Sequence, residues 1–113
     1  MRRLFSLIAV WLALVLGAAP SFAANSYNSA QIFSANCTLC HMGGGNVVNP
    51  ERTLKLDALY AYLANYSADP EAAVAYQVEK GKNAMPAFGG RLSATQIADV
   101  AAYVVEQAFN DWA

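Results

Sequence analysis

The sequence of 113 residues has little of the material from which common protein sites are built. Its two cysteines are too few for a disulfide-dense scaffold, and its one histidine cannot supply a multi-histidine zinc site. The 7 Lys+Arg and 8 Asp+Glu nearly balance, which argues against a nucleic-acid-binding protein. Only 13% of the residues are charged while 57% are hydrophobic, which excludes a disordered chain. A chain of this length and composition is expected to form a single folded domain.

The one long apolar run lies at the N-terminus. Two arginines precede an uncharged stretch over residues 4–19, and the small residues Ser21 and Ala23 follow it. A basic segment, an apolar segment and a small-x-small cleavage site are together typical of a secretory signal peptide. A retained membrane anchor is the alternative, but the run is shorter than the roughly 20 residues that span a bilayer. We therefore expect cleavage after Ala23, which removes residues 1–23 and leaves residues 24–113 as an exported domain.

The domain that would remain is small and acidic. Loss of two arginines leaves five basic residues against eight acidic ones, a formal net charge of −3. A surface of this sign favours partners that present basic groups. A chain of this size folds alone with a limited apolar core, which would gain from a large buried cofactor.

Weak strand signals and abundant helix formers predict an all-α fold for this domain. Four helices are expected, with approximate bounds 28–36, 53–65, 69–81 and 93–111. The stretches at 42–50 and 82–92 are rich in glycine and are expected to be irregular loops. Loops of about ten residues in so small a domain usually serve a function.

Cys37, Cys40 and His41 form the most informative pattern of the chain, C-x-x-C-H. This pattern is the attachment signature of c-type haem. Two thiols separated by three helical steps reach one edge of a porphyrin, where each adds across a vinyl group to form a thioether. The adjacent imidazole then lies under the iron and can bind it. The pattern therefore predicts one covalently bound haem c.

Other interpretations of the two cysteines are weaker. A thioredoxin-like redox pair normally lies in a βαβ context, and no strand pattern precedes Cys37. Half of a zinc site would need further ligands, and the chain has no other cysteine and no second histidine. A chance pattern would require the only histidine to fall directly after the pair.

The opposite face of the iron could be open, or it could be closed by methionine, histidine or a small molecule. Met42 is adjacent to His41 and cannot reach that face. Met85 lies in the second irregular stretch and is followed by Pro86, so we expect it to be the second axial ligand. The alternative is that Met85 only fills a gap in the core.

A His/Met pair leaves no vacant position for oxygen or peroxide, so it predicts a one-electron carrier and not an enzyme. A haem enzyme or sensor with an open distal site is the competing hypothesis, and a thiol oxidoreductase without haem is a third. The electron is expected to leave through an exposed haem edge during transient docking, which is small in area and assisted by charge.

Three runs of the sequence resemble the cytochrome c6 family: residues 31–48, residues 82–92 and residues 97–104. The most specific is Asn-Ala-Met-Pro-Ala-Phe-Gly-Gly-Arg-Leu at 83–92. The resemblance implies a class I cytochrome c fold, with four helices around one haem, and a monomer in the thylakoid lumen. It also implies electron transfer from the cytochrome b6f complex to photosystem I. A respiratory terminal oxidase, or another partner of a related subtype, is the alternative.

The resemblance also implies roles for particular residues. Cys37 and Cys40 match the thioether attachments, and His41 and Met85 match the axial ligands. Gln77 matches a glutamine that lies against the haem and helps to set its potential, although it could also be an ordinary surface amide. Arg91 matches an arginine near the docking surface, and the alternative is a solvated loop charge.

Overall fold

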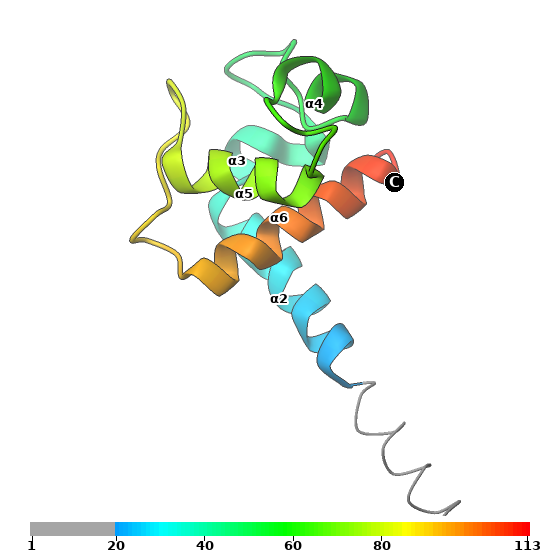
Figure 1. Ribbon diagram of the computed structural model, residues 1–113, viewed down its shortest axis with the longest axis vertical. Coiled ribbons are helices and arrows are strands. Elements are labelled where there is room, and N and C mark those ends of the chain that lie inside the picture. Colours follow the sequence, from blue (N-terminus) through cyan, green and yellow to red (C-terminus); the bar gives the residue numbers. More distant parts are fainter. Residues whose placement is uncertain (1–19) are drawn as a thin grey trace, which may run out of the picture.

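The computed structural model describes residues 20–113, with side chains from Asn28 onward. Residues 1–19, which hold most of the expected signal peptide, lie outside the described part of the chain. Its elements, shown in Figure 1, are α2 (Pro20–Asn36), α3 (Thr38–His41), the 3-10 helix η1 (Met42–Gly44), α4 (Leu56–Tyr62), α5 (Pro70–Lys80) and α6 (Ala94–Phe109). Residues 20–113 contain helices and no strand, so the predicted all-α fold is confirmed.

Two helices differ in length from the prediction. α2 extends from the predicted start near residue 28 back to Pro20, and no glycine or proline lies between Pro20 and Asn36 to interrupt it. α4 is shorter at both ends than the predicted 53–65. Its C-cap Leu63 is extended, and Asn65 is left-handed with φ 67°, so the chain turns away before the predicted end.

The region after the C-x-x-C-H motif is more ordered than predicted. The motif itself forms α3, and the expected irregular stretch at 42–50 begins with η1. Gly43 has φ 65°, a left-handed conformation that glycine adopts without steric cost. The description of residues 42–50 as a loop without any element was therefore wrong for its first three residues.

The predicted N-terminal boundaries of α5 and α6 are confirmed. The Asp69 side chain accepts a hydrogen bond from the Ala72 N–H at 3.2 Å, and Pro70 occupies the first turn of α5. At the start of α6, the Ser93 hydroxyl accepts from the Gln96 N–H at 3.1 Å. The Gln96 side chain accepts in return from the Ser93 N–H at 2.9 Å, which completes a capping box.

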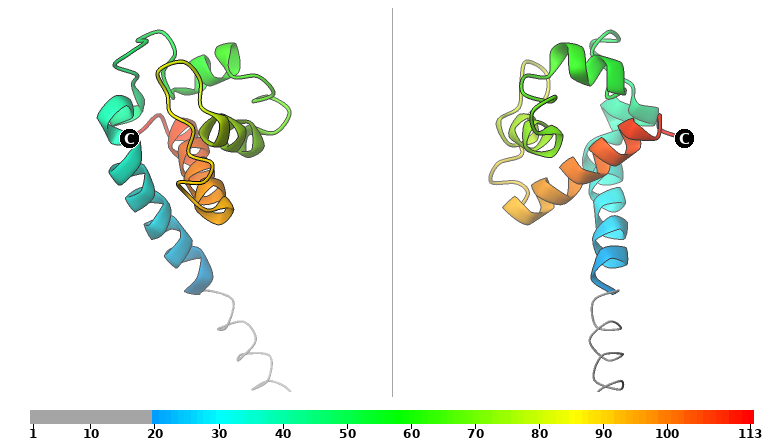
Figure 2. Two further views of the ribbon diagram at one scale, coloured as in Figure 1. Left: turned by 90° about the vertical axis from the view of Figure 1, so that its left-hand side faces the viewer. Right: turned by 45° about the vertical axis from the view of Figure 1, so that its right-hand side comes forward.

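The core forms where α6 packs against both α2 and α5. α2 and α6 cross, and α4 lies across the end of the molecule far from the start of α2 (Figures 1 and 2). The apolar stripe of α6 is buried as predicted, with Ile97, Val100, Ala101, Val104 and Ala108. At the crossing, the rings of Phe33 and Tyr103 lie with their centroids 5.2 Å apart.

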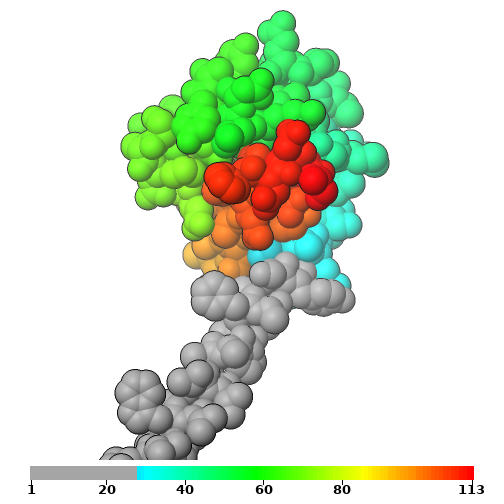
Figure 3. Space-filling model, turned by 90° about the vertical axis from the view of Figure 1, so that its right-hand side faces the viewer, coloured from blue at the N-terminus to red at the C-terminus, as the bar shows by residue number. Residues whose placement is uncertain are grey.

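The C-terminal residues after α6 lie against the segment that joins α3 to α4 (Figure 3). The Trp112 side chain is half-buried there, and its Nε1 donates to the Leu54 carbonyl at 3.0 Å. No helix within residues 20–113 has both the length and the apolar character needed to cross a bilayer.

Candidate functional site

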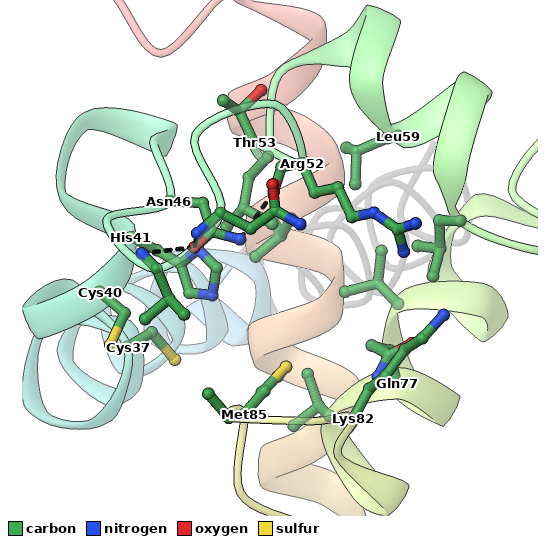
Figure 4. Close-up of a pocket in the computed structure, with 18 of the residues that line it drawn as sticks. Cys37, Cys40, His41, Asn46, Arg52, Thr53, Leu59, Gln77, Lys82 and Met85 are labelled. Carbon is green, nitrogen blue, oxygen red and sulfur yellow. Dashed lines mark hydrogen bonds between the residues drawn. The ribbon is translucent and has the colours of Figure 1, made fainter.

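A cavity of about 410 Å³ lies between α3, α4, α5 and the loop at 82–92, a size that suits a cofactor. Its lining includes Cys37, Cys40, His41, Gln77 and Met85 (Figure 4). The structure thus brings together in one cavity five of the six residues singled out in the sequence. The sixth, Arg91, is exposed and lies outside this lining, with its guanidinium 5.0 Å from the centre of the Phe88 ring.

His41 is oriented by a backbone carbonyl. Its Nδ1 lies 2.9 Å from the Gly45 oxygen, and a carbonyl can only accept, so Nδ1 must carry the proton of this hydrogen bond. In the neutral ring Nε2 then keeps its lone pair. A histidine whose other ring nitrogen donates to a carbonyl is the usual arrangement of a metal-binding imidazole.

The two thiols flank the first turn of α3. Cys37 is its N-cap and Cys40 lies within it, so the helical spacing expected for attachment to one porphyrin edge is present. Both are free cysteines. Burial raises the pKa of the Cys37 thiol to about 11, so this thiol stays protonated at neutral pH. A disulfide exchanger attacks through a thiol of lowered pKa, so Cys37 does not suit that role.

A zinc site is also disfavoured. In the part of the chain that the structure describes, no three side chains among His, Cys, Asp and Glu are grouped so that they could hold a metal ion. The two thiols and the imidazole at residues 37–41 therefore do not supply even three ligands of a tetrahedral zinc set.

Met85 is held on a tight turn across the cavity from His41. The Lys82 N–H donates to the Met85 carbonyl at 3.0 Å, and the Met85 N–H donates to the Lys82 carbonyl at 2.9 Å. The turn follows Gly81, which has φ 69°, and includes Asn83 at φ 53°. Figure 4 shows the Met85 sulfur and the His41 ring pointing into the same space from different elements. Met85 is partly buried and also packs against the hydrophobic core, so it has contacts on both the core side and the cavity side.

Two cationic side chains that the sequence did not single out line the cavity. Arg52 and Lys82 both contribute to its wall, whereas none of its described lining residues is a carboxylate. The Arg52 guanidinium lies 5.0 Å from the centre of the Tyr62 ring, a cation–π distance. Within the loop that joins η1 to α4, Asn46 Nδ2 donates to the Arg52 carbonyl at 2.8 Å, a contact that no sequence motif marks.

The donor set fits a haem. Two neighbouring thiols, an imidazole with a free Nε2 and a thioether face one cavity with a largely apolar wall of side chains from α2, α4, α5 and α6. Two cationic side chains on this wall suit a ligand that is apolar over its face and anionic at one edge.

The helical fold and the C-x-x-C-H site define a class I c-type cytochrome. Residues 24–104 match the family described as "Cytochrome C oxidase, cbb3-type, subunit III". The chain is 52% identical over 115 residues to cytochrome c6 of Picosynechococcus sp., a match that covers 98% of each chain. It is 59% identical over 83 residues to cytochrome c6 of Limnospira maxima, covering 74% of this chain and 93% of the relative. The chain belongs to the cytochrome c6 family.

A solved structure supports the same assignment. Cytochrome c6 from the diatom Phaeodactylum tricornutum superposes with a TM-score of 0.73 at 53% identity, over 77% of this chain and 98% of that one. Proteins of this family are electron carriers and not enzymes, and each carries one covalently bound haem c. The class I fold, the cofactor and the electron-carrier role expected from the sequence are therefore confirmed.

Proposed function

We propose that this chain carries single electrons from the cytochrome b6f complex to photosystem I in the thylakoid lumen. The observation that supports this best is the cavity in which Cys37, Cys40, His41 and Met85 meet. A carrier between two large complexes needs a redox centre that is tethered, enclosed on both faces and close to the surface. These four residues supply the tether and both axial ligands.

The proposed site assigns a separate task to each residue. Cys37 and Cys40 form the two thioethers, and His41 binds the iron through Nε2 while Nδ1 donates to Gly45. Met85 binds the opposite face, which excludes exogenous ligands. When bound, the haem supplies a reversible Fe(III)/Fe(II) couple.

The surroundings of the site favour the reduced state. Thioether ligation stabilises Fe(II), and the apolar wall disfavours the extra charge of Fe(III), so both raise the reduction potential. Gln77 lines the cavity from α5 and is half-buried, which supports its proposed role as a haem contact that tunes this potential.

Export to the lumen follows from the proposed signal peptide. Cleavage after Ala23 would remove the first four residues of α2, Pro20 to Ala23, and keep the part of the helix that packs against α6. Phe33 of α2 is buried, and its contact with Tyr103 would remain in the mature protein.

Arg91 is the proposed contact to the partner. Its side chain is exposed on the same loop as Met85, and its guanidinium stacks on Phe88, which limits its motion. We propose that Arg91 pairs with an acidic group of the partner, a local contact opposite in sign to the domain's overall acidic charge, so Arg91→Gln should slow reduction of photosystem I by about two- to tenfold at low ionic strength. For the unsubstituted protein, the rate should fall as salt rises. Flash-induced photosystem I kinetics against salt concentration measure both effects.

Lys55→Gln is the matched control, because it removes the same charge from another exposed position. Equal rates for the two variants would mean that only net charge matters and that Arg91 is not at the interface. A faster reaction with a terminal oxidase than with photosystem I would favour the respiratory alternative.

A further inference from the structure

The chain makes an unfavourable turn directly after α6. Asp111 has φ 55° and Trp112 has φ 56°, two consecutive left-handed residues that are not glycine. L-amino acids adopt this conformation at a cost in free energy, and it persists only where surrounding contacts impose it. The turn is closed by the Trp112 N–H, which donates to the Gln107 carbonyl at 2.8 Å. The contacts of the Trp112 side chain must therefore offset the strain of its backbone.

The turn directs the indole ring of Trp112 onto the segment between α3 and α4. The ring lies with its centre 5.3 Å from that of Phe33, and Nε1 donates to the Leu54 carbonyl at 3.0 Å. It also covers Gly44 so closely that a Cβ atom on Gly44 would lie 2.5 Å from the ring. Gly44 is therefore required by the indole as well as by its own φ of 80°.

The same segment carries the hydrogen-bond partner of His41. The Leu54 N–H donates to the Gly44 carbonyl at 2.8 Å, so the two backbone sites that Trp112 contacts are joined to each other. Gly45 comes next in the chain, and its carbonyl lies 2.9 Å from His41 Nδ1. A continuous set of contacts thus leads from the Trp112 indole through Gly44 to the imidazole.

We propose that Trp112 is a positioning residue for His41, because it holds the segment at 44–54 so that the Gly45 carbonyl stays at hydrogen-bonding distance from Nδ1. The role rests on the proposed function in one respect, namely that His41 binds the haem iron. A carbonyl that accepts from Nδ1 fixes the plane of the ring and makes Nε2 a stronger donor. A strong donor stabilises Fe(III), so Trp112 tunes the potential through a residue that it does not touch.

Two substitutions of Trp112 in the holoprotein test this role. Trp112→Phe keeps an aromatic ring over Gly44 but loses the N–H that donates to Leu54, and Trp112→Ala loses both. Phe109→Ala is the matched control, because Phe109 lies at the same end of α6 and is 79% exposed. The readouts are the solvent-exchange rate of the His41 Nδ1 proton, measured by NMR in the reduced protein, and the midpoint potential.

We expect exchange of the Nδ1 proton to accelerate about two- to tenfold in Trp112→Phe, the change that follows from the loss of one hydrogen bond. Trp112→Ala should give a larger acceleration and a higher potential, while Phe109→Ala should change neither value. A Trp112→Phe protein with unchanged exchange and potential, and with only a lower melting temperature, would overturn the positioning role.

The proposed ligation of the haem iron by His41 has its own test, which is independent of the Trp112 variants. The unsubstituted protein should show the ring protons of His41 at shifts moved by the haem ring current. Absence of such signals would overturn the ligation of iron by His41, and the positioning role with it, before any variant is compared.

Discussion

Replacing Met85 with alanine should lower the reduction potential by about 0.1–0.3 V and leave the haem attached, because axial-ligand identity is the main determinant of the potential. Loss of the thioether removes the ligand that stabilises Fe(II). Cys37, Cys40 and His41 are untouched, so the tether and the other axial bond remain. The potential is measured by spectroelectrochemical titration, and covalent attachment by denaturing electrophoresis with haem staining.

The spectrum gives a second readout of the same substitution. Sulfur ligation produces a weak band at about 695 nm in the oxidised protein, and Met85→Ala should abolish it. The reduced variant should also bind carbon monoxide, which the unsubstituted protein should not. Met42→Ala is the control, because Met42 is 71% exposed and should leave the potential and the band unchanged. A potential that does not move in Met85→Ala would mean that Met85 is not a ligand.

Gly81→Ala should destabilise the protein by about 2–4 kcal/mol, because two costs add. Gly81 has φ 69°, which an alanine adopts only with strain. Its new Cβ would also lie 2.6 Å from the Met85 carbonyl oxygen and 2.7 Å from the Ala87 nitrogen, and backbone atoms cannot rotate away as a side chain can. The loop that carries Met85 must therefore shift, and we expect the band at about 695 nm to disappear well below the melting temperature.

Gly90→Ala distinguishes the cost of the left-handed φ from the cost of the Cβ contact. Gly90 has a similar φ of 85°, but nothing lies within 4 Å of a Cβ added there. This variant should lose only about 1 kcal/mol, the cost of the left-handed conformation, and should keep its sulfur band. Denaturant unfolding monitored at the band and by circular dichroism measures both variants. Equal losses would show that the contact between Gly81 and the methionine loop has no energetic weight.

The parts of the fold that were predictable from sequence are those set by local chemistry. Asp69, Ser93 and Gln96 mark helix starts because their side chains bond to backbone within three residues, and Pro70 suits the first helical turn. The C-x-x-C-H motif is equally local, because one turn of helix sets the positions of both thiols and the imidazole. The structure places these residues at one cavity, as the motif predicts.

The parts that were missed depend on contacts distant in sequence. Trp112 donates to Leu54, which lies 58 positions earlier, and neither residue has a pattern that signals the other. α4 also ends earlier than predicted, at Tyr62, with Asn65 left-handed beyond it. Non-glycine residues rarely adopt this conformation, so local sequence gives no reason to expect it there.

Extraction with acidified acetone tests the central claim most directly, namely that Cys37 and Cys40 hold a haem by covalent bonds. The solvent removes haem bound only by axial ligands, whereas thioethers withstand it. We expect the red colour to remain with the precipitated protein, and a proteolytic fragment containing residues 37–41 to carry the added mass of one haem. A colourless precipitate with the pigment in the solvent would contradict the account.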